Sequence, residues 1–113
     1  MNNTQKLDLQ KHKENIFREM LKQELNNRLN KYGYFKQFDN EDLKIDDEKR
    51  WVFQLRYNGK RQIEIYNQDW RDYTEYFHLK IDDMEIFKVN ILDYSDLNMA
   101  FETLYKEIEK NIK

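Results

Sequence analysis

Apolar side chains recur along the first third of the chain at the spacing of an α-helix. Between residues 4 and 32 they follow steps of three and four, and polar residues fill the other positions: Ile16, Phe17, Met20, Leu21, Leu25, Leu29 and Tyr32. Gly33 follows the last of these, where a left-handed C-terminal cap is expected. The pattern predicts a helix over residues 4–32. Its first part, within residues 1–12, is expected to fray because Leu7 and Leu9 fit the stripe poorly.

Strict alternation of apolar and polar residues then predicts a first β-hairpin. The apolar positions are Trp51, Phe53, Leu55, Ile63 and Ile65. Asn58-Gly59 between the two runs is a strong hairpin signal. A two-residue loop there would place apolar beside polar residues, whereas a three-residue loop over 57–59 pairs Phe53 with Ile63. We therefore expect the three-residue loop, with Gly59 at the left-handed position of a bulged turn.

The same alternation predicts a second hairpin and, after it, a closing helix. The apolar strand positions are Phe77, Leu79, Ile81, Phe87, Val89 and Ile91. The turn is expected at Asp82-Asp83, with an odd loop length that keeps these residues on one face. A helix over residues 95–111 follows, with Asp93 or Ser95 as its N-cap. Its apolar stripe is Leu97, Phe101, Leu104, Tyr105, Ile108 and Ile112.

Each predicted hairpin has one apolar face and each helix one apolar stripe, which together indicate an α+β fold. The economical arrangement is a two-layer sandwich of order α-β-β-β-β-α, with both helices on one face of a four-stranded antiparallel sheet. The 113 residues form a single domain over 1–113. Tyr34, Phe35 and Phe38 are compatible with a short strand, and residues 39–50 are expected to be an acidic, solvated connecting loop.

Composition adds limits to this picture. The mean hydropathy is −1.13, but 15% aromatic residues supply enough packing surface for a core. A net charge of −2 argues against a polybasic nucleic-acid arm. There is no apolar run long enough for a membrane span and no signal peptide, so we expect a cytoplasmic protein. Abundant Asn, Lys, Ile and Tyr with a single Ala follow AT-rich codons, which indicates a bacterium or one of its phages or plasmids.

Candidate catalytic chemistry is sparse. The chain has no Cys, two Gly and one Ser. A catalytic thiolate is therefore excluded, and there are too few glycines for a phosphate-binding loop. His78 would need an orienting carboxylate to act as a general base, and Glu64 is the cross-strand candidate. A partly exposed strand histidine is the plainer interpretation. The acidic pairs Asp46-Asp47 and Asp82-Asp83 are typical of turns rather than of metal sites. We expect no catalytic residue, no metal, no cofactor and no enzymatic activity.

Binding is the remaining class of function. Aromatic and arginine side chains dominate interface hot spots, and such residues gather on the second sheet face and in the segment 67–73. The candidate partner-binding residues are Arg56, Tyr66, Trp70, Arg71, Tyr73, Tyr76, His78 and Lys80. In a structural interpretation, Trp70 and Tyr73 instead cover an edge of the core. The sequence favours stoichiometric binding to a larger protein, as by an antitoxin, an immunity protein or a phage inhibitor of host defence.

Two alternatives use the same sheet face. Tyr66 and Tyr76 with flanking cations are suited to stacking the bases of a single-stranded nucleic acid, although the strand order differs from that of common RNA-binding sheets and their signatures are absent. Homodimerisation would cover the same aromatic residues with a second copy of the chain.

Overall fold

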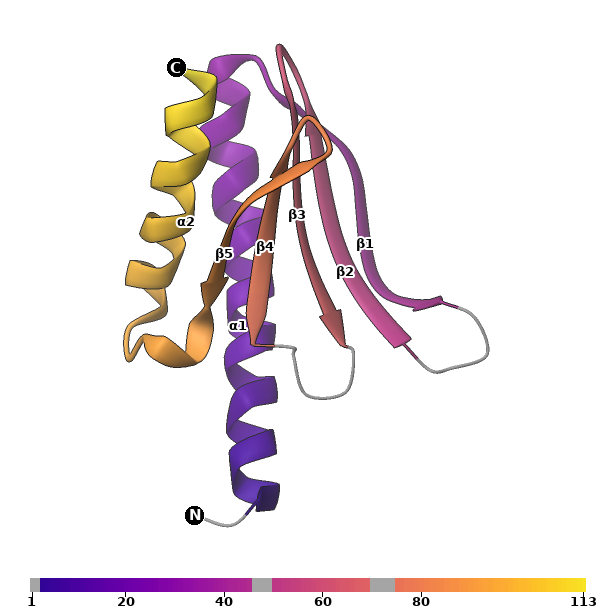
Figure 1. Ribbon diagram of the computed structural model, residues 1–113, viewed down its shortest axis with the longest axis vertical. Coiled ribbons are helices and arrows are strands. Elements are labelled where there is room, and N and C mark those ends of the chain that lie inside the picture. The colour runs from indigo at the N-terminus through magenta and orange to yellow at the C-terminus, as the bar shows by residue number, and fades with distance from the viewer. Residues whose placement is uncertain (1–2, 46–49, 70–74) are drawn as a thin grey trace.

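The computed structural model describes residues 3–45, 50–69 and 75–113, and the side chains of 9–37, 53–67 and 75–113. Helix α1 (Asn3–Leu29) and the 3₁₀ helix η1 (Asn30–Tyr32) lead into five strands, and the 3₁₀ helix η2 (Ile91–Asp93) and helix α2 (Leu97–Ile112) follow them (Figure 1). The strands are β1 (Phe35–Ile45), β2 (Arg50–Asn58), β3 (Gln62–Asp69), β4 (Tyr76–Ile81) and β5 (Met84–Asn90). They form one antiparallel sheet in the order of the chain.

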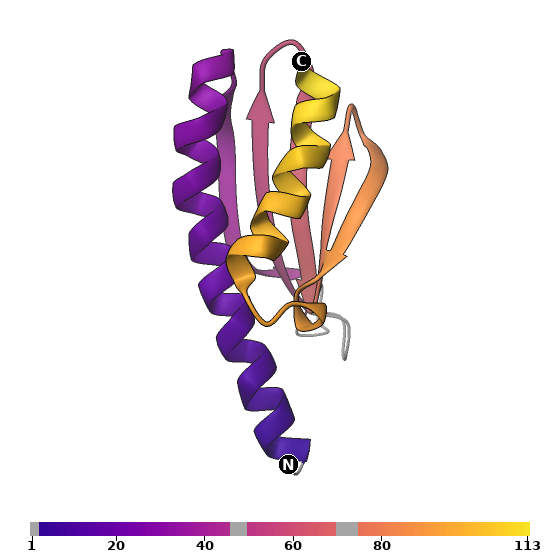
Figure 2. The same cartoon turned by 90° about the vertical axis from the view of Figure 1, so that its left-hand side faces the viewer.

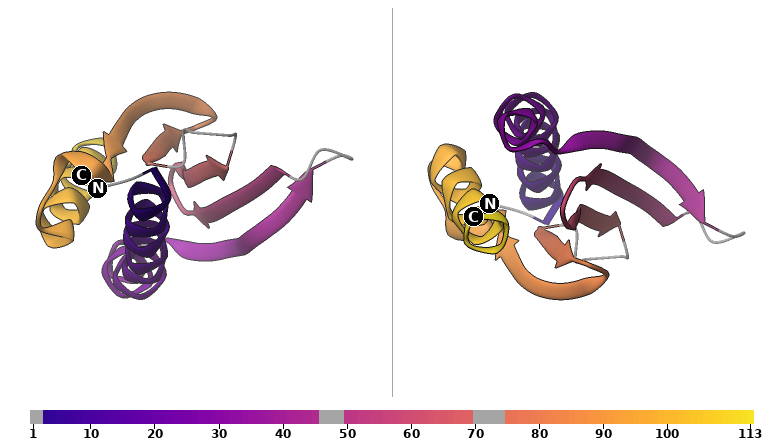
Figure 3. Two further views of the ribbon diagram at one scale, coloured as in Figure 1. Left: turned by 90° about the horizontal axis from the view of Figure 1, so that it is seen from below. Right: turned by 90° about the horizontal axis from the view of Figure 1, so that it is seen from above.

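Both helices lie on the same face of the sheet, which confirms the two-layer α+β sandwich (Figure 2). Seen end-on, α1 lies between α2 and β1, while α2 contacts β5 (Figure 3). The inward side chains of four strands are buried with those of both helices. The sheet supplies Phe53, Leu55, Tyr57, Ile63, Ile65, Phe77, Leu79, Ile81 and Val89, and α2 supplies Ala100, Phe101, Leu104, Tyr105 and Ile108.

Helix α1 buries a narrower stripe than the sequence predicts. The buried residues follow steps of four: Phe17, Leu21, Leu25 and Leu29. Ile16 and Tyr32, which the periodicity assigns to the stripe, are each 41% exposed. The first turns of α1 extend past the end of the sheet (Figure 1), so they have no sheet surface to pack against. At the other end Gly33 adopts φ 83°, the predicted left-handed cap.

The sheet contains five strands, not the predicted four. Residues 39–45, expected as the start of an acidic loop, continue strand β1 and pair with β2 from Asp39↔Leu55 to Ile45↔Arg50. The strand is irregular, with register shifts between Lys36 and Phe38 and between Asn40 and Leu43. Because each shift changes which positions face the core, the apolar residues of β1 do not alternate with polar residues. The rest of the predicted loop, residues 46–49, lies outside the described residues.

The first hairpin has a three-residue loop, as predicted, but the loop lies two residues further along. It spans Gly59 to Arg61, so that Leu55 pairs with Ile65 and Phe53 pairs with Asn67 instead of Ile63. Tyr57 causes the difference, because its side chain is fully buried and extends the inward stripe of β2 by one position. Gly59 does not adopt a positive φ, so its predicted left-handed conformation is wrong. Its role is steric: a Cβ there would lie 2.5 Å from Cδ1 of Tyr34.

The second hairpin has a two-residue turn, so the predicted odd loop length is wrong, but a bulge in β5 preserves the predicted parity. Asp82 and Asp83 form a two-residue turn with φ values of 50° and 66°, the conformation of a type I′ turn. An irregularity then leaves Ile86 as an extra residue, since Lys80 pairs with Glu85 but Leu79 pairs with Phe87. The turn and the bulge together return Phe87 and Val89 to the core-facing parity that the sequence requires.

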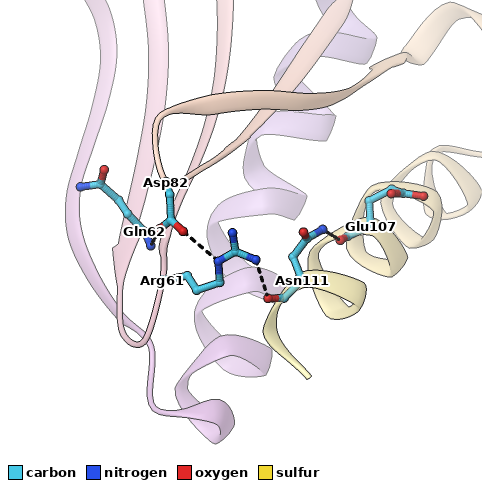
Figure 4. Close-up of polar contacts among 5 residues, drawn as sticks. All are labelled: Arg61, Gln62, Asp82, Glu107 and Asn111. Atoms are coloured by element: carbon cyan, nitrogen blue, oxygen red, sulfur yellow. Dashed lines mark hydrogen bonds and ion pairs between the residues drawn. The ribbon is translucent and has the colours of Figure 1, made fainter.

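Polar contacts tie the two hairpin turns to the end of α2 (Figure 4). Arg61 Nε donates to Asp82 Oδ2 (2.9 Å), and its Nη1 donates to the backbone carbonyl of Asn111 (3.2 Å). Asp82 Oδ1 accepts from the backbone N–H of Gln62 (2.9 Å). A cation at the C-terminal turn of a helix satisfies carbonyls that lack intrahelical partners. The start of α2 is capped by Asp96, whose side chain accepts from Asn98 N, rather than by the predicted Asp93 or Ser95.

Candidate functional site

The face of the sheet that points away from the helices carries a connected set of polar and aromatic side chains. Antiparallel pairing places them in rows across four strands: Gln54 beside Tyr66 beside His78 beside Lys88, and Arg56 beside Glu64 beside Lys80 beside Glu85. Tyr76 lies next to His78 along β4. We call this set the outer sheet face, comprising Gln54, Arg56, Glu64, Tyr66, Tyr76, His78, Lys80, Glu85 and Lys88.

A stacked pair of rings lies at the centre of the outer sheet face. The rings of Tyr66 and His78 are 4.6 Å apart between centroids and inclined by 10°. Both side chains bond to the same carboxylate oxygen: Tyr66 Oη donates to Glu85 Oε1 (3.2 Å), and His78 Nδ1 contacts that atom as well. Because an ionised carboxylate only accepts, Nδ1 of His78 carries the proton in this contact.

Two lysines lie over tyrosine rings, one over Tyr66 of this pair and one over the neighbouring Tyr76. Lys80 Nζ lies 5.0 Å from the centroid of Tyr66, and Lys88 Nζ lies 4.8 Å from the centroid of Tyr76. Both distances are in the range of cation–π attraction. Tyr76 and His78 also contact, with centroids 6.5 Å apart. The three aromatic rings of β3 and β4 therefore contact one another in succession, and one lysine lies against each tyrosine ring.

The end of the outer sheet face on β2 is organised around a buried carboxylate. Glu64 is only 4% exposed. Gln54 Nε2 donates to its Oε1 (3.0 Å), and Arg56 Nη2 donates to its Oε2 (3.1 Å). Hydrogen bonds of this kind are needed to offset the desolvation of a buried charge. Glu64 is thus engaged with β2 and does not orient His78, so that part of the sequence hypothesis is wrong.

Glu85 is the residue of the outer sheet face that sequence reasoning missed. A regular alternation through Phe87 and Val89 would direct residue 85 to the core, as it directs the other odd-numbered positions of β5. Because Ile86 is an extra residue in β5, Glu85 pairs with Lys80 and its side chain lies on the outer sheet face. The one available signal was the turn itself, because a two-residue turn at Asp82-Asp83 is compatible with the parity of the strands only if a bulge follows.

The predicted partner-binding residues divide into two groups. Five of them lie together on the outer sheet face: Arg56, Tyr66, Tyr76, His78 and Lys80. The other three, Trp70, Arg71 and Tyr73, lie outside the described residues. Whether they border the same surface stays a prediction.

Neighbouring groups on the outer sheet face lower the pKa of Glu85. Burial alone would raise the pKa of the Glu85 carboxyl, but the hydrogen bond and charge of His78, with the Tyr66 hydroxyl, hold that pKa below its usual range. Glu85 is therefore ionised at neutral pH. In the described part of the chain it is the one hydrogen-bond partner of His78, and no group of three His, Asp or Glu side chains there is arranged to hold a metal ion.

The hydroxyl of Tyr66 should lose its proton at a higher pH than an ordinary tyrosine does. Burial, followed by the charge and hydrogen bond of Glu85, raises the pKa of Tyr66 to about 12 from its usual 10. The unfolded chain loses this proton near pH 10 while the folded chain keeps it, so the stability that Tyr66 contributes is complete below pH 10 and falls as the pH rises from about 10 to about 12. Glu85→Gln removes the charge and should move this pKa back toward 10.

The measurement is tyrosinate absorbance during an alkaline titration, taken as the difference between wild type and Tyr66→Phe. The difference curve of wild type should have its midpoint near 12, and the corresponding curve in the Glu85→Gln background should have a lower one. A wild-type midpoint near 10 would contradict the geometry of this cluster.

No helix in the described ranges is both long enough and apolar enough to cross a bilayer. Comparison with protein-family models, with curated proteins and with solved structures found no match to this chain.

Proposed function

We propose that this chain is a small, non-enzymatic cytoplasmic protein that acts by stoichiometric binding to a larger protein through the outer sheet face. The supporting observation is the stacked Tyr66–His78 pair fixed by Glu85, with Lys80 over the Tyr66 ring and Lys88 over the adjacent Tyr76 ring. Side chains already held in place lose little conformational entropy when a partner binds, and aromatic residues contribute most to interface affinity. Antitoxins, immunity proteins and phage inhibitors of host defence act by this kind of binding.

The charge of the outer sheet face supports a protein partner over a nucleic acid. Its three cations, Arg56, Lys80 and Lys88, are offset by two carboxylates, and Arg56 is paired with one of them at 3.1 Å. The whole chain carries a net charge of −2. Binding to nucleic acid draws much of its affinity from neutralised phosphates, and a nearly balanced face supplies little of that. A protein partner with apolar and acidic groups suits it better.

The test is capture from a lysate of the host cell, before and after nuclease treatment, by three tagged proteins: wild type, Tyr66→Ala/Tyr76→Ala and Tyr32→Ala. Tyr32 is the matched control because it is 41% exposed in η1, away from the sheet. Wild type and the control should retain a stoichiometric protein band that resists nuclease. The double variant should bind the same partner about 100-fold more weakly or worse, since two aromatic hot spots are lost.

Thermal unfolding of the three proteins shows whether the double variant keeps its fold. A folded double variant that captures the partner as wild type does would show that the outer sheet face is not the binding surface. Co-purifying nucleic acid that disappears with nuclease, and whose affinity falls steeply with salt, would replace the proposal with the nucleic-acid alternative.

A further inference from the structure

The sheet has two edges, and they differ in how well they are protected. β1 at one edge has two register shifts and carries five charged residues: Lys36, Asp39, Glu41, Asp42 and Lys44. Bulges and charges at an edge oppose pairing with a strand of another molecule, so the edge with more of them is better protected. β5 at the other edge has one bulge and two charged residues, Glu85 and Lys88.

β5 also exposes apolar side chains. Met84 and Ile86 are 69% and 38% exposed, and Phe87 is only partly buried against the core. In Figure 2 β5 forms the right-hand edge of the sheet, and α2, which contacts β5 and β4, lies on the inner face of the sheet. Within the described residues β5 pairs with β4 alone. An apolar edge strand with open backbone groups is a template for a further strand.

The bulge at Ile86 brings the two charges of β5 onto one face. Glu85 pairs with Lys80 and Lys88 pairs with His78, so both belong to the outer sheet face. Residues three apart in a regular strand point to opposite faces. Because Ile86 is an extra residue, Glu85 and Lys88 point to the same face. They pair with Lys80 and His78, which are two residues apart on β4. Glu85 and Lys88 also have the same relation to any strand added at the open side.

Each of these charges retains capacity for a partner. Tyr66 and His78 both contact Glu85 through Oε1, which leaves Oε2 for another donor. The ammonium of Lys88 contacts the ring of Tyr76, and its charge helps to lower the pKa of Glu85, but within the described residues no carboxylate lies at ion-pair distance from it. An acceptor and a donor of opposite charge are thus spaced symmetrically about the Ile86–Phe87 bond.

We propose that a second copy of this chain adds antiparallel to β5, joining two sheets into one across a two-fold axis between Ile86 and Phe87. In this register Glu85 faces Lys88 of the partner subunit, and the symmetry repeats the pair. Ile86 likewise faces Phe87 of the partner subunit. The contact does not depend on the proposed function, because both outer sheet faces stay open on the same side of the joined sheet.

The pairing of two short strands buries less surface than an obligate dimer does, so the association should depend on concentration. Sedimentation equilibrium of the full chain should show a mass that rises from 14.2 kDa toward twice that value. Lys88→Glu turns both ion pairs into like-charge contacts and should weaken the dimer about tenfold or more. Glu85→Lys/Lys88→Glu restores opposite charges and should recover it.

Lys80→Glu is the matched control. Lys80 lies on the same face and over a tyrosine ring at a similar distance, 5.0 against 4.8 Å, but it belongs to β4, inside the sheet. This variant should dimerise as wild type does. A dimer that Lys80→Glu dissociates as strongly as Lys88→Glu would overturn β5 pairing and indicate contact through the outer sheet face.

Hydrogen exchange on wild type provides a second readout that does not rely on the folding of any variant. Raising the protein concentration should slow the exchange of β5 amides that point away from β4 and leave β1 amides unchanged. A mass of 14.2 kDa at every concentration, together with exchange rates of the β5 amides that do not change with concentration, would refute the proposal.

Discussion

Replacing Phe77 with alanine should lower the free energy of unfolding by about 3–5 kcal/mol, a large part of the roughly 5–15 kcal/mol that stabilises a domain. Phe77 on β4 is fully buried. Its ring meets Phe17 of α1 edge-on at 4.8 Å and Phe53 of β2 at 6.1 Å. Truncation therefore removes the contact that joins the helix layer to two strands and leaves a cavity between them.

Denaturant unfolding measures this loss, and the chain offers a matched control. Phe35→Ala makes the same chemical change at a side chain that is 65% exposed at the start of β1, so it should alter the unfolding free energy by at most about 0.5 kcal/mol. Phe77→Leu keeps most of the buried volume and should fall between the two. Equal losses for Phe77→Ala and Phe35→Ala would show that the two layers do not meet at Phe77.

Gly59→Ala should destabilise the fold by about 1–3 kcal/mol through overpacking. A Cβ at this position would lie 2.5, 2.7 and 2.9 Å from three ring atoms of Tyr34. Tyr34 is 1% exposed, so its ring is surrounded by protein and cannot move aside into solvent. The strain comes from close approach alone, because Gly59 has no positive φ.

Lys60→Ala is the control for Gly59→Ala, since it changes the neighbouring residue of the same loop at an exposed position. It should be nearly neutral in denaturant unfolding. A double-mutant cycle with Tyr34→Leu tests the mechanism: the smaller side chain should make Gly59→Ala less harmful. Additive effects in this cycle would mean that Tyr34 is not what excludes a side chain at Gly59.

Periodicity predicted most of the fold because most elements have one buried face. Phe77, Leu79 and Ile81 alternate with polar residues and are buried as expected, and α2 buries Phe101, Leu104 and Ile108. β1 was missed because it is an edge strand whose two register shifts break the alternation. Its acidic residues, typical of a loop, are equally typical of a protected sheet edge.

The errors within the hairpins have a common physical cause. Tyr57 was assigned to a loop because a loop over 57–59 pairs Phe53 with Ile63, yet its ring is fully buried and its pairing with Ile63 sets the register of β2 against β3. Ile86 was assigned to a regular strand, yet it is the extra residue that turns Glu85 outward. A shift of one residue exchanges the two faces of a strand, so residues identified by parity alone are lost wherever a bulge intervenes.

The agreement between strand order and chain order has a consequence for how the chain folds. Each of the five strands pairs with the next one along the chain, so every strand pairing closes a short loop and the sheet has a low contact order. Little loop-closure entropy opposes each hairpin in turn. The exception is α1, which contacts η2 and α2 across most of the chain length. We expect the sheet and α2 to assemble from local contacts, and the docking of α1 to be the step with the largest entropic barrier.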